Sequence, residues 1–457
     1  MGQDDLTKKH VIYGSAGMAA AGMIPTAKSK RPEDEVPDEP AEPVEEPELE
    51  PEIAEGEGSE SAGDIGEESG EIADQPGEDA PEPEIVEFAG RKAVVIEHAG
   101  AGNFGHNLDT IFSRLEGVRL DAVAEGNPEA VEEAQTRTGA KNAYADYREM
   151  LDQEQPDLVA VAPRWTDQRY EMIKAALEAG AHVCCERPFA RTLKEADELL
   201  ELAKVENLKI AVMHQMRCDP HLEEFHDKHE ELIGDLLEMR VLGMMDDRAG
   251  GEDLLVLGTH LFDIVRWFGG EVSFCTARIE KDGNTALAED SHESEQENLG
   301  RLLGDSIHAQ FALDSGVQVS YVSDRRLREV SGPWGIEFVG STGRMRLFAG
   351  MPPTLSLLVE SDPESPDRTD KWVRWPDVSD DDYHAPVDKM SGLDAANRHV
   401  VTDWLAAIEE DRDPKCSGES AMKSLEMIHG VWQAGVTMKR AYFPLVNRLH
   451  PLNEEEE

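Results

Sequence analysis

Two side chains with acid–base potential stand close together in an apolar stretch of the chain. His260 carries an imidazole, which titrates at about pH 6.5 when unperturbed, so it can act as a general acid or base. Asp263 follows three residues later, and residues three apart lie on one side of a helix. We expect a helix over 254–268 and Asp263 fixing the tautomer of His260. The alternative is a histidine that only packs between helix and sheet.

A short charged motif, Glu186-Arg187-Pro188, closes an apolar strand expected over 182–185. Ligands of doubly wound sheets bind beyond the carboxyl ends of the strands, so this motif is expected beside a cofactor. A guanidinium stays protonated at any working pH. Arg187 can therefore orient a hydroxyl or a carboxylate, but it cannot relay a proton.

A glycine-rich turn follows an apolar strand at 93–96 and precedes helical spacing over 103–115. The turn is Gly100, Ala101, Gly102, Asn103, Phe104 and Gly105, a GxGxxG pattern. In this context the glycines allow a tight turn and close approach of a pyrophosphate, which the first turn of a helix then holds. The pattern favours a dinucleotide cofactor.

Glu125 supports this interpretation, because it ends the second expected strand, where a carboxylate can accept hydrogen bonds from the adenosine ribose. A carboxylate repels a 2′-phosphate, and the neighbouring Gly126 and Asn127 supply no cation. NAD is therefore favoured over NADP. The alternative is that Glu125 is a surface loop residue.

Two further segments are expected near the cofactor. His214, Gln215 and Arg217 follow a strand expected over 209–213 and either line the substrate cleft or have a structural role. Arg164 and Trp165 follow the strand expected over 157–162, and Trp165 is either a wall against the cofactor or part of the core.

The elements around these residues indicate two domains. Over 89–216 short apolar strands alternate with helical segments, which predicts a doubly wound parallel sheet of the Rossmann kind. Over 217–452 strands are expected at 272–280, 306–313, 316–322, 335–340, 343–347 and 354–359, followed by helices at 393–408 and 417–438. This predicts an α+β domain with a large, mostly antiparallel sheet. The fold class is thus α/β with a second α+β domain.

The N-terminal part has a different composition. Residues 31–88 form an acidic linker rich in Pro and Glu, without the apolar side chains needed to offset ordering entropy, so disorder is expected. Residues 1–30 contain a weakly apolar stretch after two lysines, and an export signal and a disordered N-terminus both remain open. An exported and a cytoplasmic location stay equally open.

Composition excludes several classes of protein. With 44 Lys+Arg against 96 Asp+Glu the formal net charge is −52, which disfavours binding to nucleic acid and to anionic membranes. No apolar run is long enough for a transmembrane helix. Five cysteines without a CxxC pair indicate neither a disulfide scaffold nor structural zinc, and no metal site is expected.

The order of these motifs resembles the glucose–fructose oxidoreductase / inositol dehydrogenase (Gfo/Idh/MocA) family. Glu186-Arg187-Pro188 is similar to its EKP motif, and Gly250-Gly251 followed by Gly258-Thr259-His260 and Asp263 is similar to its GG…GxHxxD helix. The resemblance covers about residues 91–452. It implies a C-terminal sheet that forms a homo-oligomer interface and hydride transfer between a nicotinamide dinucleotide and a sugar or polyol. By position it assigns cofactor binding to Gly100, Gly102, Gly105 and Glu125, a place at the nicotinamide and substrate to Glu186, Arg187 and Pro188, and catalysis to His260.

Three departures from the family pattern bear on activity. The lysine of EKP is Arg187, the acid one turn before the histidine is Val256, and Arg169 stands where the family often has a histidine. Two alternatives to a dehydrogenase therefore stay open. One is a glycosidase-like enzyme of the same superfamily that recycles tightly held NAD, and the other is a non-catalytic dinucleotide-binding protein.

Overall fold

The computed structural model describes residues 90–97, 106–294, 297–330, 332–360, 370–377 and 392–453. The expectations for residues 1–88 and for Gly100, Gly102, Asn103, Phe104 and Gly105 fall outside this range. Among the helices described, none combines the length and the apolar character that crossing a bilayer requires.

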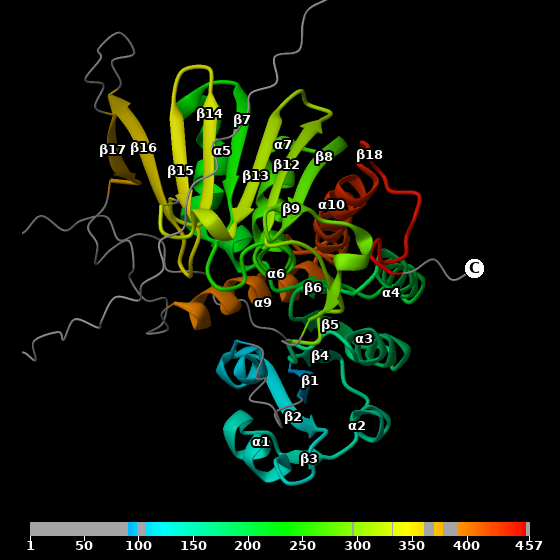
Figure 1. Cartoon of the computed structure of the whole chain (residues 1–457). Coiled ribbons are helices and arrows are strands. Elements are labelled where there is room, and N and C mark those ends of the chain that lie inside the picture. Colours follow the sequence, from blue (N-terminus) through cyan, green and yellow to red (C-terminus); the bar gives the residue numbers. More distant parts are fainter. Residues whose placement is uncertain are drawn as a thin grey trace, which may run out of the picture. The chain divides into compact units, whose positions relative to one another are not determined.

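The first sheet has six parallel strands in the order β3-β2-β1-β4-β5-β6, which confirms the Rossmann arrangement (Figure 1). Its strands are β1 (Arg91–Glu97), β2 (Val118–Glu125), β3 (Asn142–Tyr144), β4 (Leu158–Val161), β5 (His182–Cys185) and β6 (Ile210–Val212). All four residues of β4 are buried. Continuous burial of this kind is typical of a parallel strand covered on both faces.

Different parts of the chain cover the two faces of this sheet. One face packs against α2 (Tyr147–Glu154), α3 (Arg169–Glu178) and α4 (Leu193–Val205). The other packs against α1 (Val131–Thr138) and against α9 (Leu393–Glu409), which comes from near the end of the sequence. Trp404 of α9 is fully buried there, and its indole Nε1 donates to the carbonyl of Lys209 at 3.2 Å.

The helix expected over 103–115 is wrong for the described part of that segment. Residues 106–115 form two short 3₁₀ turns, η2 (Leu108–Thr110) and η3 (Phe112–Arg114). His106 and Asn107 adopt left-handed backbone conformations (φ 49° and 67°), which a continuous α-helix cannot contain. The apolar spacing that suggested a helix instead buries Leu108, Ile111 and Phe112 against the sheet.

The second sheet has ten strands in the order β17-β16-β15-β14-β7-β13-β12-β8-β18, with β9 beside β8. All pairs are antiparallel except β7–β13, so the expected mostly antiparallel sheet is confirmed. Its strands are β7 (Leu236–Leu242), β8 (Val272–Lys281), β9 (Asn284–Thr285), β12 (Ser306–Leu313), β13 (Gln318–Asp324), β14 (Gly335–Gly340), β15 (Arg344–Phe348), β16 (Thr354–Glu360), β17 (Lys371–Trp375) and β18 (Ala441–Tyr442). A small separate hairpin pairs β10 (His292–Glu293) with β11 (Arg301–Leu302).

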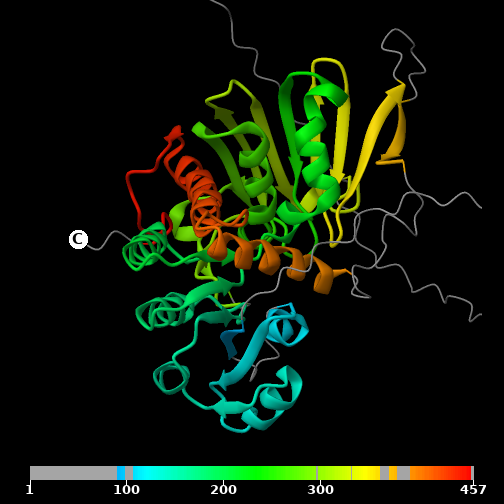
Figure 2. The same ribbon diagram turned by 180° about the vertical axis from the view of Figure 1, so that it is seen from behind.

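Three helices, α5 (Pro220–Ile233), α7 (Gly258–Gly269) and α10 (Gly418–Thr437), lie over one face of the large sheet (Figure 2). Ile279 of β8 points toward this layer, where it occupies the space beside Gly435 of α10. Because side chains alternate along a strand, Arg278 and Glu280 point to the opposite face.

The single helix expected over 254–268 is two helices, α6 (Gly251–Val256) and α7, separated at Leu257. Val256 and His260 therefore do not follow one another on a continuous helix, and His260 lies in the first turn of α7. No strand was expected at β7, because its mixture of charged and apolar residues hides the alternation.

The segment before α10 also contacts the parallel sheet. The backbone N–H of Val212 donates to the carbonyl of Cys416 at 2.8 Å, and Ala211 forms an antiparallel bridge with Ser417. The edge strand β6 is thus paired on its outer side by the chain just before α10.

Candidate active site

Glu186, Arg187 and Pro188 follow β5 directly, at the carboxyl edge of the parallel sheet, as expected. The Glu186 side chain is buried, and its Oε1 lies 3.1 Å from Nδ1 of His106. Burial alone would raise the pKa of the Glu186 carboxyl, but the hydrogen bond and charge of His106, together with Arg187 and Arg169, lower it. Glu186 is thus held as a carboxylate.

Glu297 brings the second part of the chain to this motif. Its Oε1 lies 3.1 Å from Nη1 of Arg164, and its Oε2 lies 3.7 Å from Nη1 of Arg187. One carboxylate therefore stands between two guanidinium groups that come from the loops after β4 and β5. Trp165 is half-buried in the same loop as Arg164.

Arg169 holds those two loops together. It is fully buried in the first turn of α3, and its guanidinium donates to the backbone carbonyls of Pro163 and Pro188. The arginine at the family's histidine position is thus a structural clamp between the loop after β4 and the Glu186-Arg187-Pro188 loop.

His260 is buried in the first turn of α7, and its Nδ1 has no hydrogen-bond partner among the described residues. Its ring centroid lies 5.4 Å from that of His214 and 6.3 Å from that of Trp334. Burial lowers the pKa of the His260 imidazole well below its ordinary value, and His214, Arg187 and His106 lower it further, against the effect of Asp263. The imidazole is therefore neutral near pH 7.

Asp263 does not orient His260, as the sequence led us to expect, but pairs with His214. Its Oδ1 lies 3.7 Å from Nδ1 of His214, and it accepts hydrogen bonds from Ser420 Oγ at 2.6 Å and from Arg217 Nη1 at 3.3 Å. Burial alone would raise the pKa of the Asp263 carboxyl, but Arg217, His214 and Ser420 hold it below its usual range. His214 directly precedes η4 (Gln215–Cys218), which carries Arg217, and Ser420 lies in α10, so the contacts of Asp263 run to these two parts of the chain.

Gln215 connects three elements. Its Nε2 donates to Oδ1 of Asn397 on α9 at 2.9 Å, and Asn397 Nδ2 donates to the carbonyl of His106 at 2.8 Å. Gln215 thus supports the loop that carries His106. The guanidinium of Arg217 donates to Asp263 and lies 5.1 Å from the centroid of the Trp267 ring, so Arg217 also supports the site.

Several buried polar atoms of this region have no protein partner within the described part of the chain. They are Nδ1 of His260, Nε2 of His214, Nη1 of Arg187, Oε1 of Gln215 and Nε1 of Trp334. Buried donors and acceptors in native proteins are nearly always paired with protein, water or a ligand. The set of donors and acceptors suits a ligand with several hydroxyl groups.

The carboxyl ends of β1 and β2 carry two buried carboxylates, Glu97 and Glu125, as register partners. The Asn127 N–H donates to Glu125 Oε1 at 2.7 Å, which holds this carboxylate at the end of β2. Burial raises the pKa of the Glu97 carboxyl to about 8, against the charge and hydrogen bond of Arg137. The Arg137 guanidinium, which lies at this edge of the sheet, already has two acidic partners, Glu97 and Asp109.

Sequence reasoning missed four residues of the site: His106, Glu297, Trp334 and Ser420. His106 could have been found, because it directly follows the glycine turn. The other three lie in polar loop or helix-start sequence with no pattern of their own. Among the described residues no group of three or more His, Cys, Asp or Glu side chains is arranged to hold a metal ion.

A parallel dinucleotide-type sheet joined to a helix-backed mixed sheet, with a buried histidine facing the ends of β4 and β5, defines a two-domain oxidoreductase. The family model described as "Oxidoreductase family, NAD-binding Rossmann fold" matches residues 93–214, and the one described as "Oxidoreductase family, C-terminal alpha/beta domain" matches residues 245–439. The chain belongs to the Gfo/Idh/MocA oxidoreductase family, as its motifs indicated, and its first domain is an NAD-binding Rossmann domain.

Known relatives agree with this assignment. The chain is 23% identical to D-apiose dehydrogenase of Paraburkholderia graminis over 344 residues, 73% of this chain and 85% of that protein. It is 24% identical to myo-inositol 2-dehydrogenase of Thermotoga maritima over 255 residues, 54% of this chain and 72% of that protein. A solved levoglucosan dehydrogenase, in complex with NADH and levoglucosan, has the same fold, with a TM-score of 0.63, 19% identity and coverage of 78% of this chain and 100% of that one.

Proposed function

We propose that the protein is an NAD-dependent dehydrogenase that oxidises a CH–OH group of a sugar or polyol. The observation that carries this proposal is the cluster of unpartnered buried donors and acceptors around His260, at the carboxyl edge of the parallel sheet. The relatives named above act on apiose, inositol and levoglucosan, all of which carry several hydroxyl groups.

The residues present fit the cofactor. Glu125 would hold the adenosine ribose and Glu186 to Pro188 would lie at the nicotinamide, with Arg164 and Trp165 beside them. When bound, NAD supplies the acceptor for the hydride. The glycine-rich turn, with Gly100, Gly102, Asn103, Phe104 and Gly105, would hold the diphosphate.

We assign the protein's own chemistry as follows. His260, kept neutral by burial, takes the proton of the reacting hydroxyl. Arg187 donates a hydrogen bond that orients a substrate oxygen, since its Nη1 has no hydrogen-bond partner among the described residues. Asp263 acts through His214: it fixes the tautomer of that ring, whose Nε2 is left to contact the substrate beside His260.

The test incubates the full chain with NAD or NADP and with each member of a panel of sugars and polyols: levoglucosan, D-apiose, myo-inositol, D-glucose and D-xylose. Formation of reduced nicotinamide is followed by its absorbance at a wavelength where the oxidised form does not absorb. We expect turnover with NAD on at least one member, and loss of kcat by roughly a hundredfold or more in His260→Asn with NADH binding unchanged. Absence of turnover in both directions would contradict the proposal. The glycosidase-like alternative would instead release an aglycone without net reduced cofactor.

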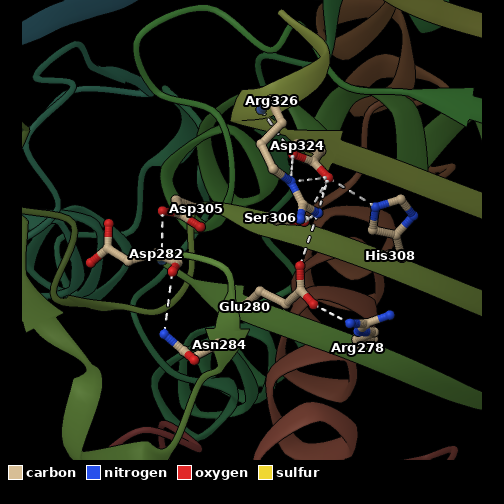
Figure 3. A network of polar contacts seen from close by, with 9 residues as sticks. All are labelled: Arg278, Glu280, Asp282, Asn284, Asp305, Ser306, His308, Asp324 and Arg326. Carbon is tan, nitrogen blue, oxygen red and sulfur yellow. Dashed lines mark hydrogen bonds and ion pairs between the residues drawn. The ribbon is translucent and has the colours of Figure 1, made fainter. Parts of the chain in front are cut away.

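We also propose a homo-oligomer that forms through the open face of the large sheet. This face carries charged and aromatic side chains in mutual contact: Arg346 lies 3.8 Å from the ring of Trp372 and donates to Glu337 at 2.8 Å. At the β8–β12–β13 end, Asp324 and Glu280 are buried, and Arg326 pairs with both (Figure 3). Satisfied charges on a sheet face suit contact with a second copy. Light scattering of the full chain should give at least twice the mass of one chain, and a monomer would exclude this interface.

A further inference from the structure

We propose that Glu297 sets the charge class of the substrate: it fills the anion-binding position between Arg164 and Arg187, so that the site takes uncharged sugars and excludes sugar acids. This inference rests on the proposed dehydrogenase function and names the chemistry that its substrate must have.

The geometry around Glu297 is that of a bound carboxylate. Its two oxygens face two different guanidinium groups, Oε1 at 3.1 Å from Arg164 and Oε2 at 3.7 Å from Arg187. Arginine pairs are the usual way in which a protein binds a carboxylate ligand. The Glu297 side chain is largely buried (14% exposed), as is that of Arg187 (6% exposed), so solvent does little to weaken the pairing.

The contact with Arg187 is incomplete. Nη1 of Arg187 and Oε2 of Glu297 are both buried without a hydrogen-bond partner among the described residues. Arg187 thus keeps a donor for a neutral substrate hydroxyl, while Glu297, which it shares with Arg164, offsets part of its charge. A substrate carboxylate at the same place would meet the negative charge of Glu297.

The backbone of Glu297 is fixed to the Rossmann domain. The Thr166 N–H donates to the carbonyl of Glu297 at 3.1 Å, and the carbonyl of Asn298 accepts from Thr166 Oγ1 at 2.6 Å and from Arg191 Nε at 3.1 Å. Glu297 and Asn298 both have positive φ, 54° and 45°, which non-glycine residues adopt only where surrounding contacts hold them. The carboxylate is therefore placed by the fold and not by a freely moving side chain.

Three guanidinium groups and two carboxylates meet near this point. Arg164 and Arg187 face Glu297, Glu186 faces His106, and the guanidinium of Arg169 is directed to two backbone carbonyls. Neutralising Glu297 would remove one of the two negative charges and make the surroundings of the substrate more positive by one unit, which is the field that attracts a sugar acid.

The experiment compares Glu297→Gln with Glu297→Asp and with Glu293→Gln, an exposed glutamate on the neighbouring strand β10. Each protein is assayed with NAD on D-glucose, D-xylose and myo-inositol and on D-gluconate, D-xylonate and D-glucuronate. Calorimetry of D-gluconate added to the protein with NADH provides a readout that does not need turnover.

We expect Glu297→Gln to gain about tenfold or more in kcat/KM on at least one acid relative to its uncharged counterpart, and to bind D-gluconate when the wild type does not. Glu297→Asp and Glu293→Gln should keep the wild-type preference. The inference is overturned if Glu297→Gln, with an unchanged melting temperature, still oxidises uncharged sugars and neither oxidises nor binds an acid, or if the wild type takes both classes equally. A wild type inactive on every sugar would contradict the proposed function instead, and the D-gluconate binding arm would still decide the role of Glu297.

Discussion

The carboxylate of Asp263 lies 3.7 Å from Nδ1 of His214, a residue 49 positions earlier, although His260 is only three positions away on its own helix. Of these two histidines, only His214 has a carboxylate within 4 Å of its ring nitrogens among the described residues. Arg217 and Ser420 also donate to Oδ1 of Asp263, whereas its Oδ2 is buried without a hydrogen-bond partner among the described residues. The site holds a His–Asp pair beside a second, neutral histidine.

Asp263→Asn should lower kcat by roughly a hundredfold, because an amide cannot select the same tautomer of His214 as a carboxylate does. KM should change little, since Asp263 does not itself reach the substrate. Steady-state kinetics on the sugar identified by the panel would measure both. Ser420→Ala, which removes one hydrogen bond to the same carboxylate, should cause a smaller loss, and an Asp263→Asn enzyme with wild-type kcat would refute the assigned role.

Glu125→Gln should weaken NAD binding by about tenfold and narrow its preference over NADP. The amide can still accept from the Asn127 N–H, but it pairs less strongly with ribose hydroxyls and no longer repels a 2′-phosphate. Calorimetric titration with NADH and NADPH measures both affinities. Glu129→Gln, an exposed neighbour, is the matched control, and equal NADH affinity in both variants would count against a ribose contact.

Arg169→Lys should cost about 2–4 kcal/mol of unfolding free energy. The lysine keeps the charge, but a single ammonium cannot reach the carbonyls of Pro163 and Pro188 together, and one or both stay buried without a donor. Urea unfolding would show the loss. Arg148→Lys, at an exposed arginine, should leave the urea midpoint unchanged.

Acidification should destabilise the protein through its buried histidines. Burial, with Arg301 and Arg191, lowers the pKa of His450 from 6.5 to about 4, and burial lowers that of its neighbour His429 well below the ordinary value. Between pH 6.5 and pH 4, His450 binds a proton in the unfolded chain but not in the folded chain. The free energy of unfolding is therefore highest above pH 6.5 and falls toward pH 4.

His450→Asn isolates that contribution. The difference in unfolding free energy between wild type and variant should shift by up to about 1.4 kcal/mol per pH unit across this window, and be constant above it. Chemical unfolding at several pH values measures it, and a pH-independent difference would mean that His450 titrates normally in the folded chain.

Much of the fold could be predicted from the sequence, because the apolar strands of the parallel sheet and the strand pairs β12–β13 and β14–β15 of the large sheet depend on local patterns. The His260 position and the Glu186-Arg187-Pro188 loop followed in the same way from family motifs. The partner of Asp263 could not be predicted, since it depends on how α7 is rotated against η4 and α10. Nor could Glu297, whose role arises only when a loop of the second domain reaches the first.

The pairing of β6 with the segment at Cys416 and Ser417 protects the protein against aggregation. An uncovered outer strand offers a row of backbone donors and acceptors that other chains can extend into an aggregate. The segment just before α10 thus covers the edge of the parallel sheet. A protein truncated before residue 410 should precipitate by strand addition at β6, although all six strands of the parallel sheet are still present.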